Sequence, residues 1–201
     1  MLKRAFFLGS KKFGIECFKA LKKSDYKVKW TIICPNDFKD MRSNFREFKT
    51  YTKKENIELF IINNSQELKN YINDQKPEFM FVCGFYNILH TNIIRKFKFG
   101  VWGIHNSLLP KYRGGSPLVW QIINNEKMLG SSLFQLGSGI DDGPIISQVK
   151  IKNSKSMKIG LATTKIQKMW VKKIPSLFKK LIKGKISPKI QNNIYATYFR
   201  Q

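Results

Sequence analysis

Short apolar runs alternate along this chain with longer amphipathic segments, and this alternation restricts the fold more than any other feature. The short runs that we expect to form strands are Arg4–Leu8, Val28–Ile33, Glu58–Ile62, Glu78–Cys83 and Gly100–His105. The segments between them with helical patterns are Phe13–Lys22, Phe38–Lys54, Gln66–Asn73 and Ile93–Lys96. Strands that alternate with helices form mostly parallel sheets, whose right-handed crossovers place helices on both faces. The sequence therefore predicts an α/β fold with a doubly wound, mostly parallel, Rossmann-like sheet.

The second half of the chain adds one more helix, two strand-like runs around a glycine-rich turn, and a long amphipathic helix. We expect these elements at Leu118–Asn124, Gly130–Leu136, Pro144–Ile151 and Ile159–Leu181. A length of 201 residues, 42% of them hydrophobic, suits one globular domain with a substantial core. We therefore predict one domain over residues 1–182, followed by a short, basic, irregular tail at 183–201.

The N-terminus and the cysteines indicate the compartment. The first residues are basic and then apolar, as in a signal peptide, but the apolar part is only Ala5–Leu8 and lysines follow directly, so a first strand is the better interpretation. Cys17, Cys34 and Cys83 are widely spaced, which favours buried, reduced thiols in a cytoplasmic protein over a disulfide or a zinc site. No apolar run reaches the roughly 18 residues that span a bilayer, so we expect no membrane span.

The formal net charge of +24 is the most unusual feature of the composition. Such a charge predicts binding to nucleic acid or to another anionic surface. Most of the basic residues are lysines, in a chain that is also rich in Ile, Asn and Phe, and a general compositional bias would produce the same pattern. Both explanations stay open at this point, and an anionic small substrate fits either of them.

His105 is one of only two histidines in the chain, and it lies at the end of a predicted strand. Ligands of parallel α/β sheets bind beyond the carboxyl ends of the strands. Histidine is also the side chain best suited to proton transfer near neutral pH. A Ser-Leu-Leu-Pro turn follows His105, and then come anion donors, a stacking ring and the pair Gly114-Gly115, which lets a ligand approach the backbone closely. We therefore treat His105 as a candidate catalytic residue and His90 as structural.

A second candidate element is the turn Asp141-Asp142-Gly143-Pro144. Paired aspartates beside glycine are common in ordinary turns. Here they are also the only acidic pair in a long basic stretch. A carboxylate close to a histidine fixes the tautomer of the ring and favours its protonated form. A carboxylate of this turn within reach of His105 would have both effects.

Residues 103–148 resemble the core of the folate-dependent formyltransferases, a family that includes methionyl-tRNA formyltransferases, glycinamide ribonucleotide formyltransferases and sugar-amine N-formyltransferases. The resemblance rests on the run His105-Asn106-Ser107-Leu108-Leu109-Pro110-Lys111-Tyr112-Arg113-Gly114, on Gly130-Ser131-Ser132, and on Asp141 with Gly143. Asp141 follows His105 by 36 residues, which is the spacing of the family. The resemblance implies that residues 1–182 form a Rossmann-like formyltransferase catalytic domain.

The resemblance also implies a reaction, which is transfer of the formyl group of N10-formyltetrahydrofolate to a primary amine without a metal. His105 would polarise the formyl oxygen or move a proton, and Asp141 would orient His105 and help to deprotonate the amine. The residues implied in folate binding are Phe85, Tyr86, Asn87, Ile88 and Leu89 in one loop, and Gly139, Ile140 and Asp142 in the glycine-rich turn. The residues implied in binding the amine substrate are Asn106, Ser107, Lys111, Tyr112, Arg113 and Trp120.

Gly103 departs from the family, which has an asparagine at this position whose amide hydrogen-bonds the oxyanion. Loss of one oxyanion donor typically lowers the rate about 10²- to 10³-fold. Three possibilities stay open: a backbone amide or a water replaces the missing donor, a displaced Asn106 replaces it, or the protein is impaired. Because His105, Asp141 and Arg113 are retained, we favour an active enzyme.

The expected acceptor is the amino group of a nucleotide-linked sugar, an anionic small molecule. The segment Gly115–Trp120 is similar to the tRNA and sugar-amine branches of the family, and the chain has no room for the further domain of a complete methionyl-tRNA enzyme. It also ends soon after Ala196-Thr197-Tyr198, so it looks cut short relative to the family. Formylation of aminoacylated tRNA, which the positive charge suits, is the alternative. Another alternative is a folate- or nucleotide-binding relative without turnover.

Overall fold

The computed structural model describes residues 3–24, 27–85 and 87–200. The chain divides into two compact units, Met1–Trp102 and Gly103–Gln201. The boundary falls inside the strand that ends at His105. The residues that carry the motifs around His105 and Asp141 therefore belong to one unit, the second.

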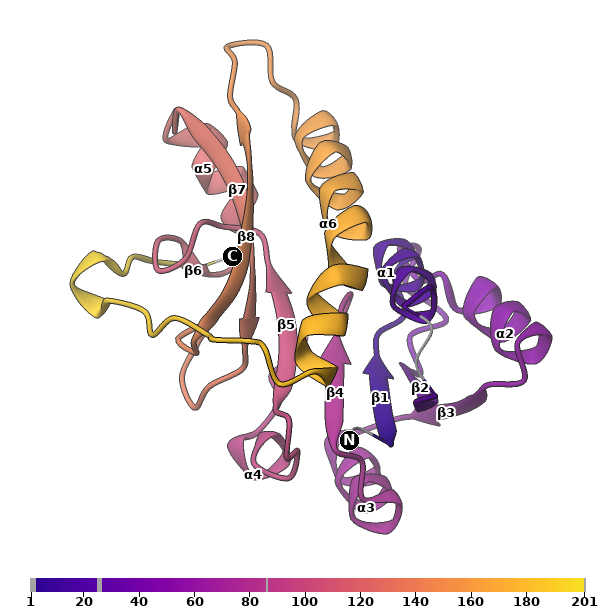
Figure 1. The fold of residues 1–201 in the computed structure, drawn as a ribbon. Coiled ribbons are helices and arrows are strands. Elements are labelled where there is room, and N and C mark those ends of the chain that lie inside the picture. The colour runs from indigo at the N-terminus through magenta and orange to yellow at the C-terminus, as the bar shows by residue number, and fades with distance from the viewer. Residues whose placement is uncertain (1–2, 25–26, 86, 201) are drawn as a thin grey trace. The chain divides into compact units, whose positions relative to one another are not determined.

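The first unit alternates strands with helices, as the sequence pattern predicts (Figure 1). Its elements are β1 (Arg4–Leu8), α1 (Lys12–Lys22), β2 (Lys29–Pro35), α2 (Phe45–Lys54), β3 (Glu58–Ile62), α3 (Ser65–Gln75), β4 (Phe79–Val82) and α4 (Thr91–Ile94). β1 pairs in parallel with β2 and with β4, and β2 pairs in parallel with β3. β1 and β2 are connected through α1, and β2 and β3 through α2, which is the helical crossover that parallel strands require.

The second unit contains the long helix and an antiparallel pair of strands. Its elements, with the strand that enters it, are β5 (Val101–His105), β6 (Arg113–Gly114), α5 (Pro117–Ile123), β7 (Met128–Gln135), β8 (Ile145–Lys152), α6 (Ile159–Ile182), the 3₁₀ helix η1 (Asn193–Tyr195) and β9 (Tyr198–Phe199). β7 pairs antiparallel with β8. The C-terminal segment, yellow in Figure 1, returns to β6, where β9 pairs with it in parallel.

The strand order of the larger sheet is β3-β2-β1-β4-β5-β7-β8. The predicted α/β class and the mostly parallel sheet are therefore confirmed. Most predicted elements are also present, with ends that differ by at most two residues. The tail after Lys183, which the sequence indicates as irregular, contributes η1 and β9 to the second unit.

One predicted helix is much shorter than expected. The prediction of Phe38–Lys54 is wrong in its first part, because α2 begins only at Phe45. The preceding residues form turns whose side chains bind Lys11: its ammonium lies 2.5 Å from Asp37 and 2.7 Å from Asp40. Asp37 also accepts hydrogen bonds from the hydroxyls of Ser10 and Ser43. These contacts hold the segment in a non-helical conformation that its apolar periodicity does not indicate.

This aspartate cluster makes an acid-sensitive contribution to stability. Burial opposes ionisation, but the hydrogen bonds from Lys11, Ser10 and Ser43 hold the pKa of Asp37 below its usual value. The folded-state pKa is lower than the unfolded value of about 3.9, so the contribution is present above that pH and is lost as the pH falls through the folded-state pKa. We expect the melting temperature of Asp37→Asn to fall less between about pH 7 and about pH 3 than that of the wild type. Asp74→Asn, at an exposed aspartate, is the control, and an unchanged pH dependence in Asp37→Asn would contradict this assignment.

The core of the first unit is aromatic and contains the three thiols. The ring of Phe7 lies 5.2 Å from that of Phe18 and 6.0 Å from that of Phe81, measured between centroids. Cys17, Cys34 and Cys83 are buried and free. Burial raises the pKa of Cys34 to about 12 and holds that of Cys17 well above its usual value. The thiols are therefore reduced core residues in this structure.

Neither a candidate membrane-spanning helix nor a candidate metal centre occurs in the part of the chain that the structure describes. None of its helices is both long enough and apolar enough to traverse a bilayer. Within residues 3–24, 27–85 and 87–200, no three His, Cys, Asp or Glu side chains gather where they could hold a metal ion.

Candidate active site

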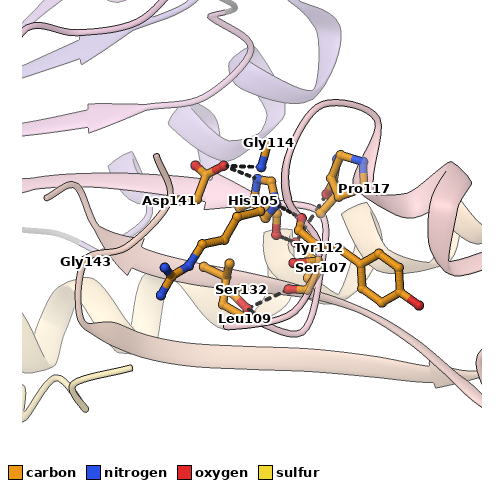
Figure 2. A network of polar contacts seen from close by, with 12 residues as sticks. His105, Ser107, Leu109, Tyr112, Gly114, Pro117, Ser132, Asp141 and Gly143 are labelled. Atoms are coloured by element: carbon orange, nitrogen blue, oxygen red, sulfur yellow. Dashed lines mark hydrogen bonds and ion pairs between the residues drawn. The ribbon is translucent and has the colours of Figure 1, made fainter. Parts of the chain in front are cut away.

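His105 is the last residue of β5, and its ring lies between two oxygen atoms (Figure 2). Nδ1 is 3.3 Å from Oδ2 of Asp141, and Nε2 is 2.7 Å from the carbonyl oxygen of Tyr112. The predicted proximity of His105 and Asp141 is thereby confirmed. The side chain of His105 is 9% exposed and that of Asp141 is 23% exposed, so the carboxylate is the more accessible member of the pair.

The two contacts of the ring define where its protons are. A carbonyl oxygen can only accept, so Nε2 carries a proton and donates it to Tyr112. Nδ1 faces a carboxylate oxygen, which is also an acceptor when it is ionised. Both contacts are satisfied together only when a second proton lies between Nδ1 and Asp141. A proton placed between Nδ1 and Oδ2 would satisfy both atoms, so the geometry allows the two groups to share one.

Two serines hold the motif loop that follows His105. The Ser107 hydroxyl donates to the carbonyl of Lys111 at 2.6 Å. The hydroxyl of Ser132, on β7, donates to the carbonyl of Ser107 at 2.6 Å and accepts from the amide of Leu109 at 3.1 Å. Ser107 is completely buried. The hydrogen bonds that Ser107 makes within this loop explain why a serine stands at this position of the motif. Its contact with the substrate stays a prediction.

The glycine-rich turn after β7 presents Asp141. Asp141 itself adopts a left-handed backbone with φ +50°. Its Oδ2 accepts from the amide of Gly114 at 3.0 Å as well as facing His105 (Figure 2). The turn is tight, since a Cβ at Gly143 would lie 1.8 Å from the carbonyl oxygen of Gln135. Only glycine fits there, which explains the Asp-x-Gly pattern in physical terms.

Asp142 has a different role from its neighbour. Its Oδ2 accepts from the amide of Gly139 at 3.0 Å and so closes the turn. Its Oδ1 is buried and, among the residues described, has no hydrogen-bond partner. Such an atom is costly to bury, and it is a local cost of the conformation of this turn.

Leu136 occupies the space beside Gly103 in which a larger side chain would lie. A Cβ built on Gly103 would be 2.6 Å from Cδ1 of Leu136 and 3.6 Å from Cε1 of Phe134. The side chain of Leu136 thus occupies part of the space that a side chain at residue 103 would need. The Asn106 side chain is oriented by Ser131, whose hydroxyl lies 3.2 Å from Oδ1, a contact that does not involve the Nδ2 donor of Asn106.

Three of the predicted substrate contacts instead hold the C-terminal segment. The Tyr112 ring stacks on Phe199, with 4.9 Å between the centroids, and its hydroxyl donates to Glu126. The Trp120 ring lies 5.0 Å from that of Phe199. Arg113 is 1% exposed. In the structure these three residues pack against the C-terminal segment. A direct contact of any of them with the substrate stays a prediction. Lys111, in contrast, is exposed.

The predicted folate residues divide between the two units. In the first, Phe85 is half-buried, Asn87 and Ile88 are exposed and Leu89 is buried, while Tyr86 lies outside the described residues. In the second, Gly139 and Ile140 are exposed. Since the two sets belong to different units, a pocket that joins them stays a prediction.

Two residues that contact this site were missed by the sequence analysis, Leu136 and Gln191. Leu136 follows a predicted strand and has no polar signal. Gln191 lies in the tail that was expected to be irregular, yet it is 6% exposed and its side chain reaches the turn of Asp141. A contact between residues 50 positions apart leaves no local pattern in the sequence.

Comparison with known proteins agrees with this geometry. The family model described as formyl transferase matches residues 2–175. The chain belongs to the formyl transferase family. A methionyl-tRNA formyltransferase from Prochlorococcus marinus is 31% identical over 163 residues, which are 77% of this chain and 49% of that protein. The bifunctional polymyxin resistance protein ArnA from Wigglesworthia glossinidia brevipalpis is 37% identical over 141 residues, which are 69% of this chain and 21% of that protein.

A solved structure shares the formyl transferase fold along the whole chain. The N-formyltransferase from Helicobacter canadensis, in complex with folinic acid and dTDP-3-aminofucose, has a TM-score of 0.78 and 22% identity, covering 100% of this chain and 71% of that one. The chain spans about half or less of the length of the two curated relatives named above. The family and the fold are therefore established, whereas the acceptor is a separate question.

Proposed function

We propose that this formyl transferase moves a formyl group from N10-formyltetrahydrofolate to the primary amine of a nucleotide-linked amino sugar. The observation that carries the proposal is the pair of His105 and Asp141 at 3.3 Å, inside the motif loop that the family resemblance identifies. Formyl transfer requires the attacking amine to lose a proton and the departing folate nitrogen to gain one. A pair that exchanges a proton between an accessible carboxylate and a buried imidazole is suited to both tasks.

Asp141 is the member of the pair that would contact the amine. An ammonium group would be drawn to its carboxylate, and the proton it releases would be held between Oδ2 and Nδ1. Because Nε2 of His105 is committed to the carbonyl of Tyr112, the proton shared by Nδ1 and Oδ2 is the one that would pass to the leaving nitrogen or to the formyl oxygen. The fixed contacts of Gly114 and Tyr112 hold both groups in place before the substrates arrive, which lowers the cost of orienting them.

The glycine-rich turn fits a reduced folate. The exposed Ile140 offers an apolar contact to the ring of a pterin, and Asp142 closes the turn that presents it. Gly139, Ile140 and Asp142 are the residues of this turn that we assign to folate. The bound folate would supply the formyl group.

A nucleotide-linked amino sugar is favoured because the similar solved protein was crystallised with dTDP-3-aminofucose. The exposed Lys111, beside the motif loop, could contact a diphosphate. The test is to incubate the purified protein with N10-formyltetrahydrofolate and a panel of dTDP- and UDP-linked amino sugars, and to measure tetrahydrofolate by absorbance and the formylated sugar by mass spectrometry. We expect turnover with at least one of them. No turnover with any sugar amine would overturn the choice of acceptor.

The second candidate is aminoacylated tRNA, which is favoured by the similarity to a methionyl-tRNA formyltransferase and by the charge of +24. If the lysines reflect composition, we expect tRNA binding to be weak and to disappear between about 50 and about 200 mM salt, because counterion release alone would drive it. Filter binding with initiator and elongator tRNA, at both salt concentrations, measures this. Tight binding at the higher salt that prefers one tRNA would favour the tRNA acceptor instead.

A further inference from the structure

Gln191, in the C-terminal segment, hydrogen-bonds both to the backbone of Asp141 and to the side chain of Arg113. Its Nε2 donates to the carbonyl of Asp141 at 2.8 Å and to the carbonyl of Gly143 at 2.7 Å. Its Oε1 accepts from Nη2 of Arg113 at 2.7 Å and from Nε at 3.2 Å. Both N–H groups and both lone pairs of the amide are used, so the side chain is fully satisfied.

Arg113, the partner of Gln191, lies between the two backbone groups that touch the pair. The preceding residue, Tyr112, gives its carbonyl to Nε2 of His105, and the following residue, Gly114, gives its amide to Oδ2 of Asp141. Arg113 is buried, and its Nη1 and Nη2 also donate to Tyr198 and Asn193. The guanidinium is thereby fixed to the segment that carries Gln191.

Asp141 needs such support, because its left-handed backbone is uncommon for a residue with a side chain. A conformation of this kind persists only where the surroundings hold it. The side-chain amide of Gln191 stabilises the turn by donating hydrogen bonds to the backbone carbonyls of Asp141 and Gly143. The same side-chain amide accepts hydrogen bonds from Arg113 and so helps to fix the backbone of the neighbouring residues Tyr112 and Gly114.

We propose that Gln191 is a positioning residue that sets the geometry between His105 and Asp141. It touches neither reacting group and acts through the backbone of Asp141 and the side chain of Arg113. Its role in turnover rests on the proposed function, whereas its effect on the His105 ring does not. Glutamine suits the position because it donates to two carbonyls and accepts from an arginine at the same time, which neither glutamate nor a hydrocarbon can do.

The decisive variant is Gln191→Glu, which has the same shape. Its carboxylate would still accept from Arg113 but would repel the carbonyls of Asp141 and Gly143. We expect kcat to fall about 10- to 100-fold, as for displacement of a catalytic group by about 1 Å, with KM for either substrate within about 3-fold. Asn193→Ala is the matched control, because it removes one acceptor of Arg113 without touching Asp141, and it should keep kcat within about 2-fold.

A second measurement separates this proposal from the proposed function. The ¹⁵N and ¹H resonances of the His105 ring, read by NMR on unliganded protein, should move in Gln191→Glu and stay in place in Asn193→Ala, with the exposed His90 as internal reference. If wild type shows no formyl transfer but the ring resonances move as expected, the positioning role stands and the reaction is wrong. If Gln191→Glu does not fold, Gln191→Met takes its place with the same expected shifts. Folded variants with unchanged kcat and unchanged ring resonances would overturn the proposal.

Discussion

Asp141→Asn is expected to lower kcat about 10²- to 10⁴-fold, the range typical for loss of a general acid–base group. Asparagine is close to isosteric, and its amide oxygen can still accept from the amide of Gly114, so the loop should keep its conformation. What it cannot do is take a proton from an amine or share one with Nδ1 of His105. His105→Ala should cause a loss of similar size, and the double variant should be little worse than either one, because the two residues act as a unit.

Steady-state kinetics of the formyl transfer assay measure these losses. The controls are His90→Ala, at an exposed histidine that lies outside the site, and circular dichroism spectra of each variant. Binding of a reduced folate, measured by calorimetry, should change little in Asp141→Asn. Retention of more than about a tenth of the wild-type kcat by Asp141→Asn would show that this carboxylate does not handle the proton.

Introducing asparagine at position 103 is expected to raise kcat only when Leu136 is shortened as well. The family asparagine would donate to the oxyanion, and a missing donor of this kind accounts for about 10²-fold in rate. In this chain, however, Cδ1 of Leu136 lies 2.6 Å from where the Cβ would be. We expect Gly103→Asn alone to lose about 1–3 kcal/mol of stability through overpacking and to gain little activity. Gly103→Asn with Leu136→Ala should gain up to about 10²-fold in kcat.

The measurement is kcat and the melting temperature of both single variants and the double variant, with Leu136→Ala as the matched control. The affinity for the formyl donor should change little in all of them, because the oxyanion forms only in the transition state. Combined with His105→Ala, the double variant should be inactive. If the double variant folds and gains nothing, another donor already faces the formyl oxygen in the wild type, and the interpretation of Gly103 as a missing donor is wrong.

The sequence predicted the features that depend on local pattern. The apolar alternation predicted the parallel strands and the strand end at His105, and the family resemblance predicted its pairing with Asp141. The failures arise from tertiary contacts between side chains, which leave no periodic pattern in the sequence. The turns before Phe45 are held by Lys11, and the contact of Gln191 with Arg113 joins residues 78 positions apart. Roles assigned to Tyr112, Arg113 and Trp120 by resemblance did not anticipate their packing against the C-terminal segment.

The buried thiols make this protein convenient for fluorescence labelling. Alkylating reagents attack exposed thiolates, whereas Cys17, Cys34 and Cys83 lie in the core and burial raises the pKa of the first two. A cysteine introduced at the exposed Ser138 would therefore react selectively in the native protein, without removal of any natural residue. A fluorophore attached there would sit on the same turn as Asp141 and could report ligand binding in real time, even for ligands that do not react.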